Sequence, residues 1–282
     1  MKLLRYGPAG QEKPGLLDRD GKIRDLSGTV RDIDGEALSP ASLDRLRRLD
    51  PATLPLVSGS PRLGACVGNI GKVIAIGLNY RKHAEEAGMP IPKEPIFFLK
   101  ANSSICGPND DTRIPKGSQK MDYEIELAIV IGSKASYIGV HDAPKHIAGY
   151  CVVNDVSERE YQLERGGTWT KGKSCDTFCP IGPWLVTADE VPDGGKLQLW
   201  TEVNGERRQD SNTADLIFGI DHIVSYLSHF MTLYPGDVIP TGTPSGVAMG
   251  FKPPRFLKAG DRVRLGVEGL GEQTQRLVAY EG

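Results

Sequence analysis

The chain has 282 residues, enough for one large domain or for a small domain joined to a larger one. Its 34 basic and 36 acidic side chains leave a formal charge of −2, which disfavours nucleic acid and anionic membranes as partners. No uncharged apolar run reaches the length of about eighteen residues that a transmembrane helix needs. Because the charged N-terminus is not typical of a signal or transit peptide, we expect a cytoplasmic protein.

The five cysteines form an odd set without a CxxC pair, which favours reduced thiols over a disulfide framework. Cys175 and Cys179 lie four residues apart, but no histidine lies close enough in sequence to complete a familiar zinc pattern. Buried apolar cysteine is therefore the favoured interpretation.

Residues 1–68 predict a small N-terminal α+β domain. Asp20 and Gly21 have the chemistry of a hairpin turn, and residues 39–50 combine a serine cap with leucines at helical spacing. Because the segment has no cluster of histidines, cysteines or convergent acids, we expect it to serve packing or dimerisation.

Residues 69–282 predict a second, larger domain in which strands dominate. Apolar runs predict strands that begin near residues 72, 96, 123 and 149, and Asn204-Gly205 predicts a hairpin between two further strands. Helical patterns are few and short: they cover residues 80–88, 157–164 and 221–232, the last with Ile223, Tyr226, Leu227 and Phe230 as an apolar stripe. The lack of regular βα alternation favours a β-rich α+β fold over a Rossmann fold or a TIM barrel.

Acidic residues begin one of these strands, in the stretch "MDYEIELAIVIG" at residues 121–132. Asp122, Glu124 and Glu126 occupy alternate positions, so a continuous strand would place them on one face. They could form a solvated strand edge. However, Asp155 also directly follows an apolar strand, and carboxylates that converge without histidine or cysteine suit Mg²⁺, Mn²⁺ or Ca²⁺.

Three further features have candidate roles. His83 and Glu86 are three residues apart in a predicted helix, so the glutamate could orient the imidazole as a general base, although such a pair is often a surface contact. Lys100 ends an apolar strand and Lys173 lies in a Gly/Ser/Pro-rich loop between strands, so either could neutralise a substrate carboxylate or an enolate, although most lysines are solvated. The turn "PTGTPSGV" offers backbone N–H groups and the Thr243 hydroxyl to an anion, but it lacks the ending of a nucleotide phosphate loop.

Together these motifs resemble the fumarylacetoacetate hydrolase family, in its acylpyruvase-like branch. The resemblance spans roughly residues 72–270 and rests on seven motifs in the family's order: "GLNYRKHAEEAG", "PIFFLKANSSICGP", "MDYEIELAIVIG", "GYCVVNDVSEREYQ", "GKSCDTFCPIGPWLVT", "VNGERRQ" and "TGTPSGVAMG". It implies a mixed β-roll catalytic domain that binds one Mg²⁺ or Mn²⁺, and a homodimer.

The resemblance also assigns roles to individual positions. It places the metal ligands on Glu124, Glu126 and Asp155, and leaves Asp122 outside the site as a supporting or solvent residue. It implies a histidine-glutamate dyad at His83 and Glu86. The positions implied to act on the substrate are Lys100, Arg159, Gln162, Lys173 and Thr243, with Lys173 stabilising the developing enolate.

The implied activity is hydrolysis of the C3–C4 bond of a 2,4-diketo acid, a carbon–carbon hydrolase reaction of the EC 3.7.1 type. The stretch "KPPRFLKAGD" and the N-terminal motifs "MKLLRYG" and "KPGLLD" resemble those of hydrolases of 2,4-diketo-3-deoxy-L-rhamnonate or -fuconate, whose products would be pyruvate and lactate. Rival activities in the family are oxaloacetate-type decarboxylation, dienoate isomerisation or hydration, and ureidoglycolate cleavage. A rival of another class is a binding module in which the acids clamp a structural Ca²⁺.

Overall fold

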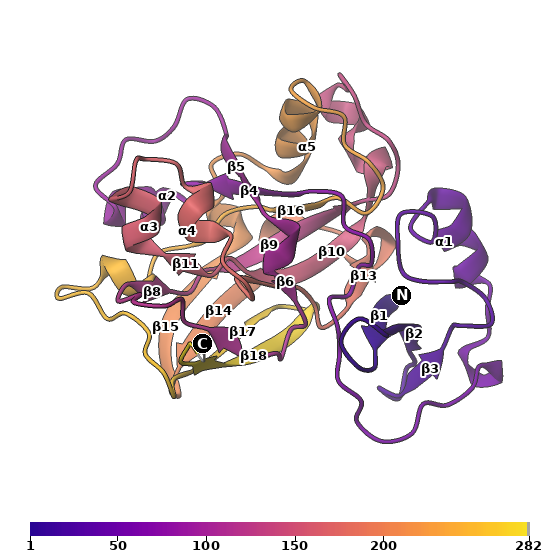
Figure 1. Ribbon diagram of the computed structural model, residues 1–282. Helices are drawn as coiled ribbons and strands as arrows, with labels where there is room; N and C mark the ends of the chain where they lie inside the picture. The colour runs from indigo at the N-terminus through magenta and orange to yellow at the C-terminus, as the bar shows by residue number, and fades with distance from the viewer. Residues whose placement is uncertain (281–282) are drawn as a thin grey trace.

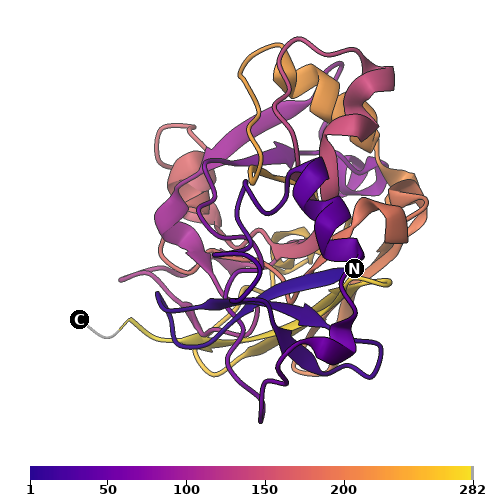
Figure 2. The ribbon, with the colours of Figure 1, turned by 90° about the vertical axis from the view of Figure 1, so that its right-hand side faces the viewer.

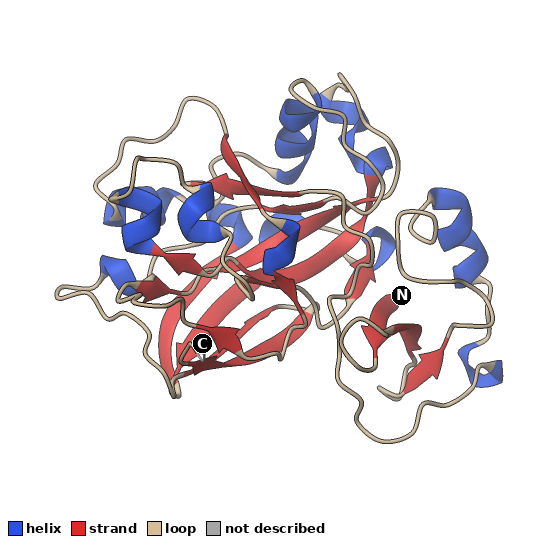
Figure 3. Ribbon diagram, in the orientation of Figure 1, coloured by secondary structure: helices blue, strands red, loops and turns tan. Residues whose placement is uncertain are grey.

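The computed structural model describes residues 1–280, in which two large mixed sheets enclose the main core. The larger sheet has nine strands, in the order β3 (Ile23–Asp25), β2 (Lys13–Leu17), β1 (Lys2–Tyr6), β13 (Leu185–Thr187), β10 (Ile147–Asn154), β9 (Ile125–Ile131), β16 (Val238–Pro240), β4 (Val73–Gly77) and β5 (Ile96–Lys100). Neighbouring strands are antiparallel except β16 and β4. Figures 1 and 3 show this sheet running across the molecule.

The second sheet has five strands, in the order β15 (Glu206–Asn212), β14 (Gln198–Val203), β17 (Arg262–Val267), β18 (Gly271–Val278) and β7 (Thr112–Arg113). Two short pairs join β8 (Met121–Asp122) to β11 (Ser157–Glu158) and β6 (Ile105–Cys106) to β12 (Cys179–Pro180). The turn between β14 and β15 lies at Asn204 and Gly205, which both have positive φ, so the predicted hairpin is confirmed.

The helices are short, as the sequence predicts: α1 (Pro40–Arg47), α2 (Arg81–Glu86), α3 (Arg159–Leu163), α4 (Thr170–Lys173) and α5 (Ile220–Ser228). Ser39 caps α1 by accepting a hydrogen bond from the Ser42 N–H, as predicted. In α5, Ile223 and Leu227 are buried, whereas Phe230, beyond the end of the helix, is 59% exposed and its ring centroid lies 4.8 Å from that of Tyr226. No helix of residues 1–280 has the length and apolarity to cross a membrane.

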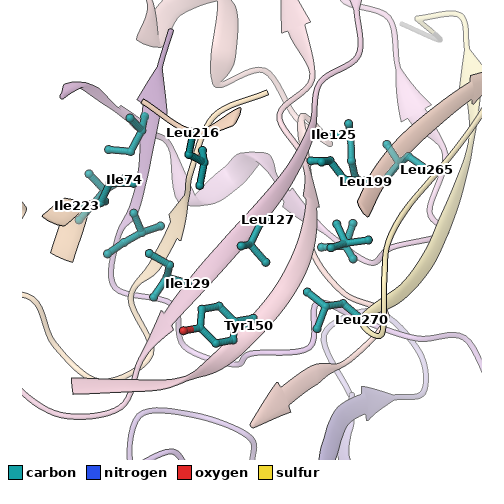
Figure 4. Packing of buried hydrophobic residues seen from close by; sticks show 14 of the residues in the cluster. Ile74, Ile125, Leu127, Ile129, Tyr150, Leu199, Leu216, Ile223, Leu265 and Leu270 are labelled. Atoms are coloured by element: carbon teal, nitrogen blue, oxygen red, sulfur yellow. The ribbon is translucent and has the colours of Figure 1, made fainter. Parts of the chain in front are cut away.

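The main core lies between the two sheets. Alternate residues of β9, among them Ile125, Leu127 and Ile129, point into it and share one buried cluster with Leu199 and Leu265 of the five-stranded sheet (Figure 4). The intervening residues of β9 point to the opposite face. Because both faces of β9 are covered, its seven residues are all buried, which explains the continuous apolar run in the sequence.

The N-terminal region packs on that opposite face of the nine-stranded sheet. β1 pairs with β13, so the three N-terminal strands extend the large sheet. A second apolar cluster joins Leu3 and Leu46 to Ala128 and Val130 of β9. Figure 2 shows these segments, in indigo, in front of the rest of the chain. The division into domains at residues 68 and 69 stays a prediction, as does the β-roll description of the larger part. The mixed sheets and few helices agree with the predicted α+β class.

The structure corrects the prediction of one strand through residues 123–131. β8 ends at Asp122 and β9 begins at Ile125, so Tyr123 and Glu124 lie in a break between them. β8 pairs with β11, whereas β9 pairs with β10 and β16, and the chain must change partners at this point. Alternation along one strand therefore does not explain why Asp122 and Glu124 lie near each other.

Candidate functional site

The three predicted metal ligands meet where strands of the large sheet begin or end. The antiparallel ladder of β9 and β10 continues past its last pair, so Asp155 lies opposite Glu124 and its N–H donates to the Glu124 carbonyl at 2.9 Å. On the other side of β9, β16 ends and the N–H of Gly242 donates to Glu126 Oε2 at 2.7 Å. Strand pairing thus brings together residues far apart in the sequence.

These carboxylates form a compact all-oxygen cluster. One oxygen from each of Glu124, Glu126 and Asp155 lies within 4.8 Å of the others, and the residues are 5%, 1% and 1% exposed. Three acids this close and this buried repel one another unless cations lie among them.

Three cations neutralise part of the cluster: Lys173, Arg159 and Lys100, the last of which pairs with Asp155. Lys173 Nζ lies 2.6 Å from Glu124 Oε2 and 2.8 Å from Asp155 Oδ2, and Arg159 Nη2 lies 2.6 Å from Glu124 Oε1. Burial raises the pKa of Glu124, but Lys173 and Arg159 outweigh burial and lower this pKa to about 2. Glu124 is therefore an anion that is already paired.

Glu126 differs from its neighbours. Within residues 1–280 no ion pair includes Glu126, and its carboxylate accepts from the Gly242 N–H. Burial raises the pKa of Glu126 well above its ordinary value, and the charges of Asp155 and Glu124 raise it further. A divalent cation bound by the three acids would supply the missing charge, and the all-oxygen donor set fits Mg²⁺ or Mn²⁺.

Asp122 supports the cluster from behind. It is fully buried, and its Oδ2 accepts from Arg159 Nε at 2.8 Å while its Oδ1 accepts from the Ala248 N–H at 2.7 Å. The solvent-residue alternative for Asp122 is therefore wrong. Asp122 fixes the guanidinium that contacts Glu124, a role that depends on the pairing of β8 with β11 and that the alternation of acids in the sequence does not indicate.

The remaining polar residues predicted to act on the substrate occupy different positions. Gln162 Oε1 accepts from Arg159 Nη1 at 3.0 Å, which leaves the amide NH₂ as the group that can donate to a ligand. Lys100 is buried behind Asp155, and its Nζ donates to the Asp155 carboxylate and to the Val156 carbonyl. Lys100 does not line the cavity described below, so its contact with a substrate stays a prediction. Lys173, expected in a loop, ends the short helix α4.

The predicted dyad is in hydrogen-bonding contact. His83 Nδ1 lies 3.0 Å from Glu86 Oε2 on α2, and Glu86 Oε1 accepts from the Gly246 N–H at 2.8 Å. A carboxylate at Nδ1 favours the tautomer with the proton on Nδ1, which leaves Nε2 to accept a proton. His83 is 7% exposed, so this geometry is enclosed by protein.

The turn after β16 was expected to bind an anion through backbone N–H groups. In the structure the N–H groups of Gly242 and Gly246 hold two carboxylates of the protein itself, those of Glu126 and Glu86. The Thr243 hydroxyl between them accepts from Gln209 Nε2 at 2.9 Å and retains its own proton for donation.

A cavity of about 200 Å³ opens over the carboxylates. The helices α2, α3 and α4, which supply His83, Arg159 and Lys173, lie together at this end of the molecule (Figures 1 and 3). The predicted residues that line the cavity are His83, Glu124, Glu126, Asp155, Arg159, Gln162, Lys173 and Thr243. Sequence reasoning missed its apolar lining, which includes Phe98 and Trp169, although a tryptophan in the Gly-rich stretch "RGGTWTKGKS" was a usable signal.

Comparison with known proteins agrees with the class that this fold and site define, namely α+β enzymes with a buried acidic cation site. Residues 72–278 match the family described as fumarylacetoacetate (FAA) hydrolase, C-terminal. A protein of Burkholderia lata, named as a hydrolase without a stated substrate, is 65% identical over 276 residues, which cover 98% of each chain.

Two solved structures extend the comparison. The 5-carboxymethyl-2-hydroxymuconate delta-isomerase of Mycobacterium smegmatis has a TM-score of 0.77 and 35% identity, with both chains fully covered. The maleylpyruvate hydrolase of Sphingobium sp. SYK-6, solved with manganese(II) and pyruvate, has a TM-score of 0.81 and 29% identity, also over both whole chains. The chain belongs to the fumarylacetoacetate hydrolase family. The family and the names of its members support an enzyme that acts on small molecules, and a hydrolase in particular.

Proposed function

We propose that this protein is a metal-dependent hydrolase that cleaves the C3–C4 bond of a 2,4-diketo acid and releases pyruvate. The observation that carries the proposal is the position of His83, held by Glu86, on the same cavity as three converging carboxylates. That arrangement combines a general base for water with a site for a 2-oxo acid bound to a cation. The manganese and pyruvate bound by the Sphingobium maleylpyruvate hydrolase support this pairing.

Glu124, Glu126 and Asp155 are the proposed ligands of Mg²⁺ or Mn²⁺. The bound cation would act as a Lewis acid toward the 2-oxo acid and stabilise negative charge on its C2 oxygen. Arg159 and Lys173 already hold two of these carboxylates in place, so little rearrangement is needed to order the ligands.

His83 is the proposed general base. With Nδ1 donating to Glu86, Nε2 accepts a proton from water, and the hydroxide oxygen forms a bond to the C4 carbonyl carbon. The C3–C4 bond then breaks, and its electron pair passes to C3 as the enolate of pyruvate. The proton taken by His83 returns to C3, so the products are pyruvate and the carboxylic acid derived from C4.

Lys173 is the proposed partner of the enolate. Its ammonium group has three protons, and two of them point to Glu124 and Asp155, which leaves the third for a substrate oxygen. Burial lowers the pKa of Lys173, but Asp155 and Glu124 outweigh burial and raise it, so Lys173 stays charged. Gln162, Arg159 and Thr243 are proposed to bind the substrate from the cavity wall, and Lys100 to act from behind Asp155.

The proposed natural substrate is 2,4-diketo-3-deoxy-L-rhamnonate or -fuconate, cleaved to pyruvate and lactate by a cytoplasmic homodimer. Its support is the sequence resemblance of the "KPPRFLKAGD" stretch and of the N-terminal motifs. A second candidate is isomerisation of a dienoate, which the structural likeness to the Mycobacterium smegmatis isomerase favours.

A coupled lactate-dehydrogenase assay for pyruvate tests the proposal across sugar-derived and aliphatic 2,4-diketo acids, with Mg²⁺ or Mn²⁺. We expect metal-dependent pyruvate release that His83→Ala removes while metal binding survives. Isomerisation of a dienoate without pyruvate release would favour the second candidate. Binding of Ca²⁺ with no turnover of any diketo acid would favour a structural clamp.

A further inference from the structure

The cavity over the carboxylates has two chemically distinct ends. Its floor consists of buried charged groups. The other end, which we call the apolar mouth, is lined by uncharged side chains, and the only polar group among them is the indole N–H of the tryptophan. These residues are Leu78, Ala87, Met89, Phe98, Leu163, Trp169 and Met249.

One wall of the mouth is an aromatic pair. The rings of Phe98 and Trp169 meet edge to face with centroids 5.6 Å apart. Trp169 packs directly on the backbone of Gly77, where an added Cβ would lie 2.2 Å from the indole ring. Phe98 also touches the floor, because Lys173 Nζ lies 5.2 Å from its ring centroid. The wall is therefore packed against Gly77 at Trp169 and against Lys173 at Phe98.

The rim of the mouth is apolar and open to water. Met89, which follows α2, is 51% exposed, and Leu163, at the end of α3, is 46% exposed. When apolar atoms of a ligand cover apolar groups at the entrance of a cavity, the removal of this surface from water makes the free energy of binding more favourable.

The cations that line the cavity are already engaged. Arg159 contacts Asp122, Glu124 and Gln162, and Lys173 contacts Glu124 and Asp155. Both lie at the floor. Among the described residues that line the cavity, no other lysine or arginine is available at the mouth to pair with a second carboxylate of a ligand.

We infer that the apolar mouth is the acyl subsite of the enzyme, and that it selects substrates whose acyl group ends in uncharged, apolar atoms. A second carboxylate held inside the rim, against Phe98 and Trp169, would lose part of its hydration without gaining a cationic partner. Among six-carbon sugar-derived acids, the mouth favours a terminal methyl group over a terminal hydroxymethyl group. The inference rests on the proposed function for the end of the ligand that lies at the floor.

The test uses two 2-oxo acids that match in length and lack the C4 carbonyl, so that neither is cleaved. Calorimetric titration of the Mn²⁺-loaded protein compares 2-oxohexanoate, which ends in a methyl group, with 2-oxoadipate, which ends in a carboxylate. We expect 2-oxohexanoate to bind about tenfold more tightly or better, since a hydrophobic site rejects a charged group that it cannot pair. Equal affinity, tighter binding of 2-oxoadipate, or failure of both to bind would overturn the inference.

A gain-of-charge variant sharpens the test. Leu163→Lys places an ammonium group at the rim, on a half-exposed position that folding tolerates, and should improve 2-oxoadipate binding by about tenfold. Leu99→Lys is the matched control, because Leu99 is 44% exposed but does not line the cavity. An unchanged preference in a folded Leu163→Lys protein, or the same change in Leu99→Lys, would count against the mouth as the acyl subsite.

These measurements are separable from the proposed function. If no 2,4-diketo acid yields pyruvate but 2-oxohexanoate still binds preferentially, the hydrolase assignment fails and the apolar mouth stands. If pyruvate is released but fumarylpyruvate, whose acyl group ends in a carboxylate, is preferred over acyl chains that end in methyl, the assignment stands and the apolar mouth fails.

Discussion

The floor and the mouth of the cavity are built on opposite physical principles. At the floor, buried acids and cations hold one another in place, so each charge depends on the presence of its neighbours. At the mouth, half-exposed apolar side chains such as Met89 and Leu163 have no such dependence. The difference teaches that the groups proposed for the reaction occupy positions intolerant of change, whereas those proposed for selectivity occupy positions where a substitution costs little stability.

The largest effect that we expect is the loss of metal affinity when Glu126, at the floor of the cavity, is replaced by glutamine. The amide of Glu126→Gln can still accept from the Gly242 N–H, but it cannot supply charge to a cation. We expect Mn²⁺ affinity measured by calorimetry to fall by more than about 100-fold, beyond the loss caused by changing an outer partner of a ligand. Thermal stability without metal should be equal or higher, since an unpaired buried carboxylate is removed. Glu85→Gln, at an exposed position on the same helix as His83, is the control and should keep the Mn²⁺ affinity of the unaltered protein. An unchanged Mn²⁺ affinity in Glu126→Gln would exclude Glu126 as a metal ligand.

The next effect separates the base from the cation site. His83→Ala should lower kcat for pyruvate release by about 10³-fold, the range of general-base catalysis, and leave Mn²⁺ affinity unchanged. His141→Ala, at an exposed histidine that does not line the cavity, should retain full activity. A His83→Ala enzyme with normal kcat would remove the dyad from the mechanism.

A smaller effect tests the claim that each buried charge at the floor depends on the charges beside it. Asp122→Ala leaves Arg159 with one carboxylate fewer in a buried site, so the free energy of unfolding in urea should fall by about 3 kcal/mol. Asp142→Ala removes the exposed ion pair with Lys145 and should leave stability unchanged. Equal free energies of unfolding for the two variants would mean that a buried ion pair at the floor contributes no more to stability than an exposed one.

The smallest effect concerns the mouth. Trp169→Ala removes a wall of the cavity but no charged group, so KM for an acylpyruvate should rise about tenfold with little change in kcat. Steady-state kinetics with Trp169→Phe, which keeps an aromatic ring, should give an intermediate KM. A fall in kcat as large as the rise in KM would move Trp169 from selectivity to the reaction itself.

The sequence predicted the parts of this site that follow from strand pairing and residue chemistry. Glu126 and Asp155 each adjoin an apolar strand, and a ladder between two such strands brings their ends together. The contact of His83 with Glu86 follows from helical spacing.

Other features depend on packing between distant segments, which local patterns do not encode. Asp122 alternates with Glu124, yet its role arises from the pairing of β8 with β11 and from Arg159. Lys100 follows an apolar strand just as Asp155 does, but only the tertiary structure places it behind the cluster. The joining of β1 to β13 also required the structure, because no residue of either strand specifies its partner.

The turn that follows β16 has a consequence for how this enzyme can be altered. The N–H of Gly242 holds Glu126, and the N–H of Gly246, four residues later, holds Glu86. A single short segment of backbone therefore holds both a proposed cation ligand and the carboxylate that orients the proposed base. We expect an insertion or deletion in the turn to displace both carboxylates together, so changes meant to alter one proposed role alone are better placed at the mouth.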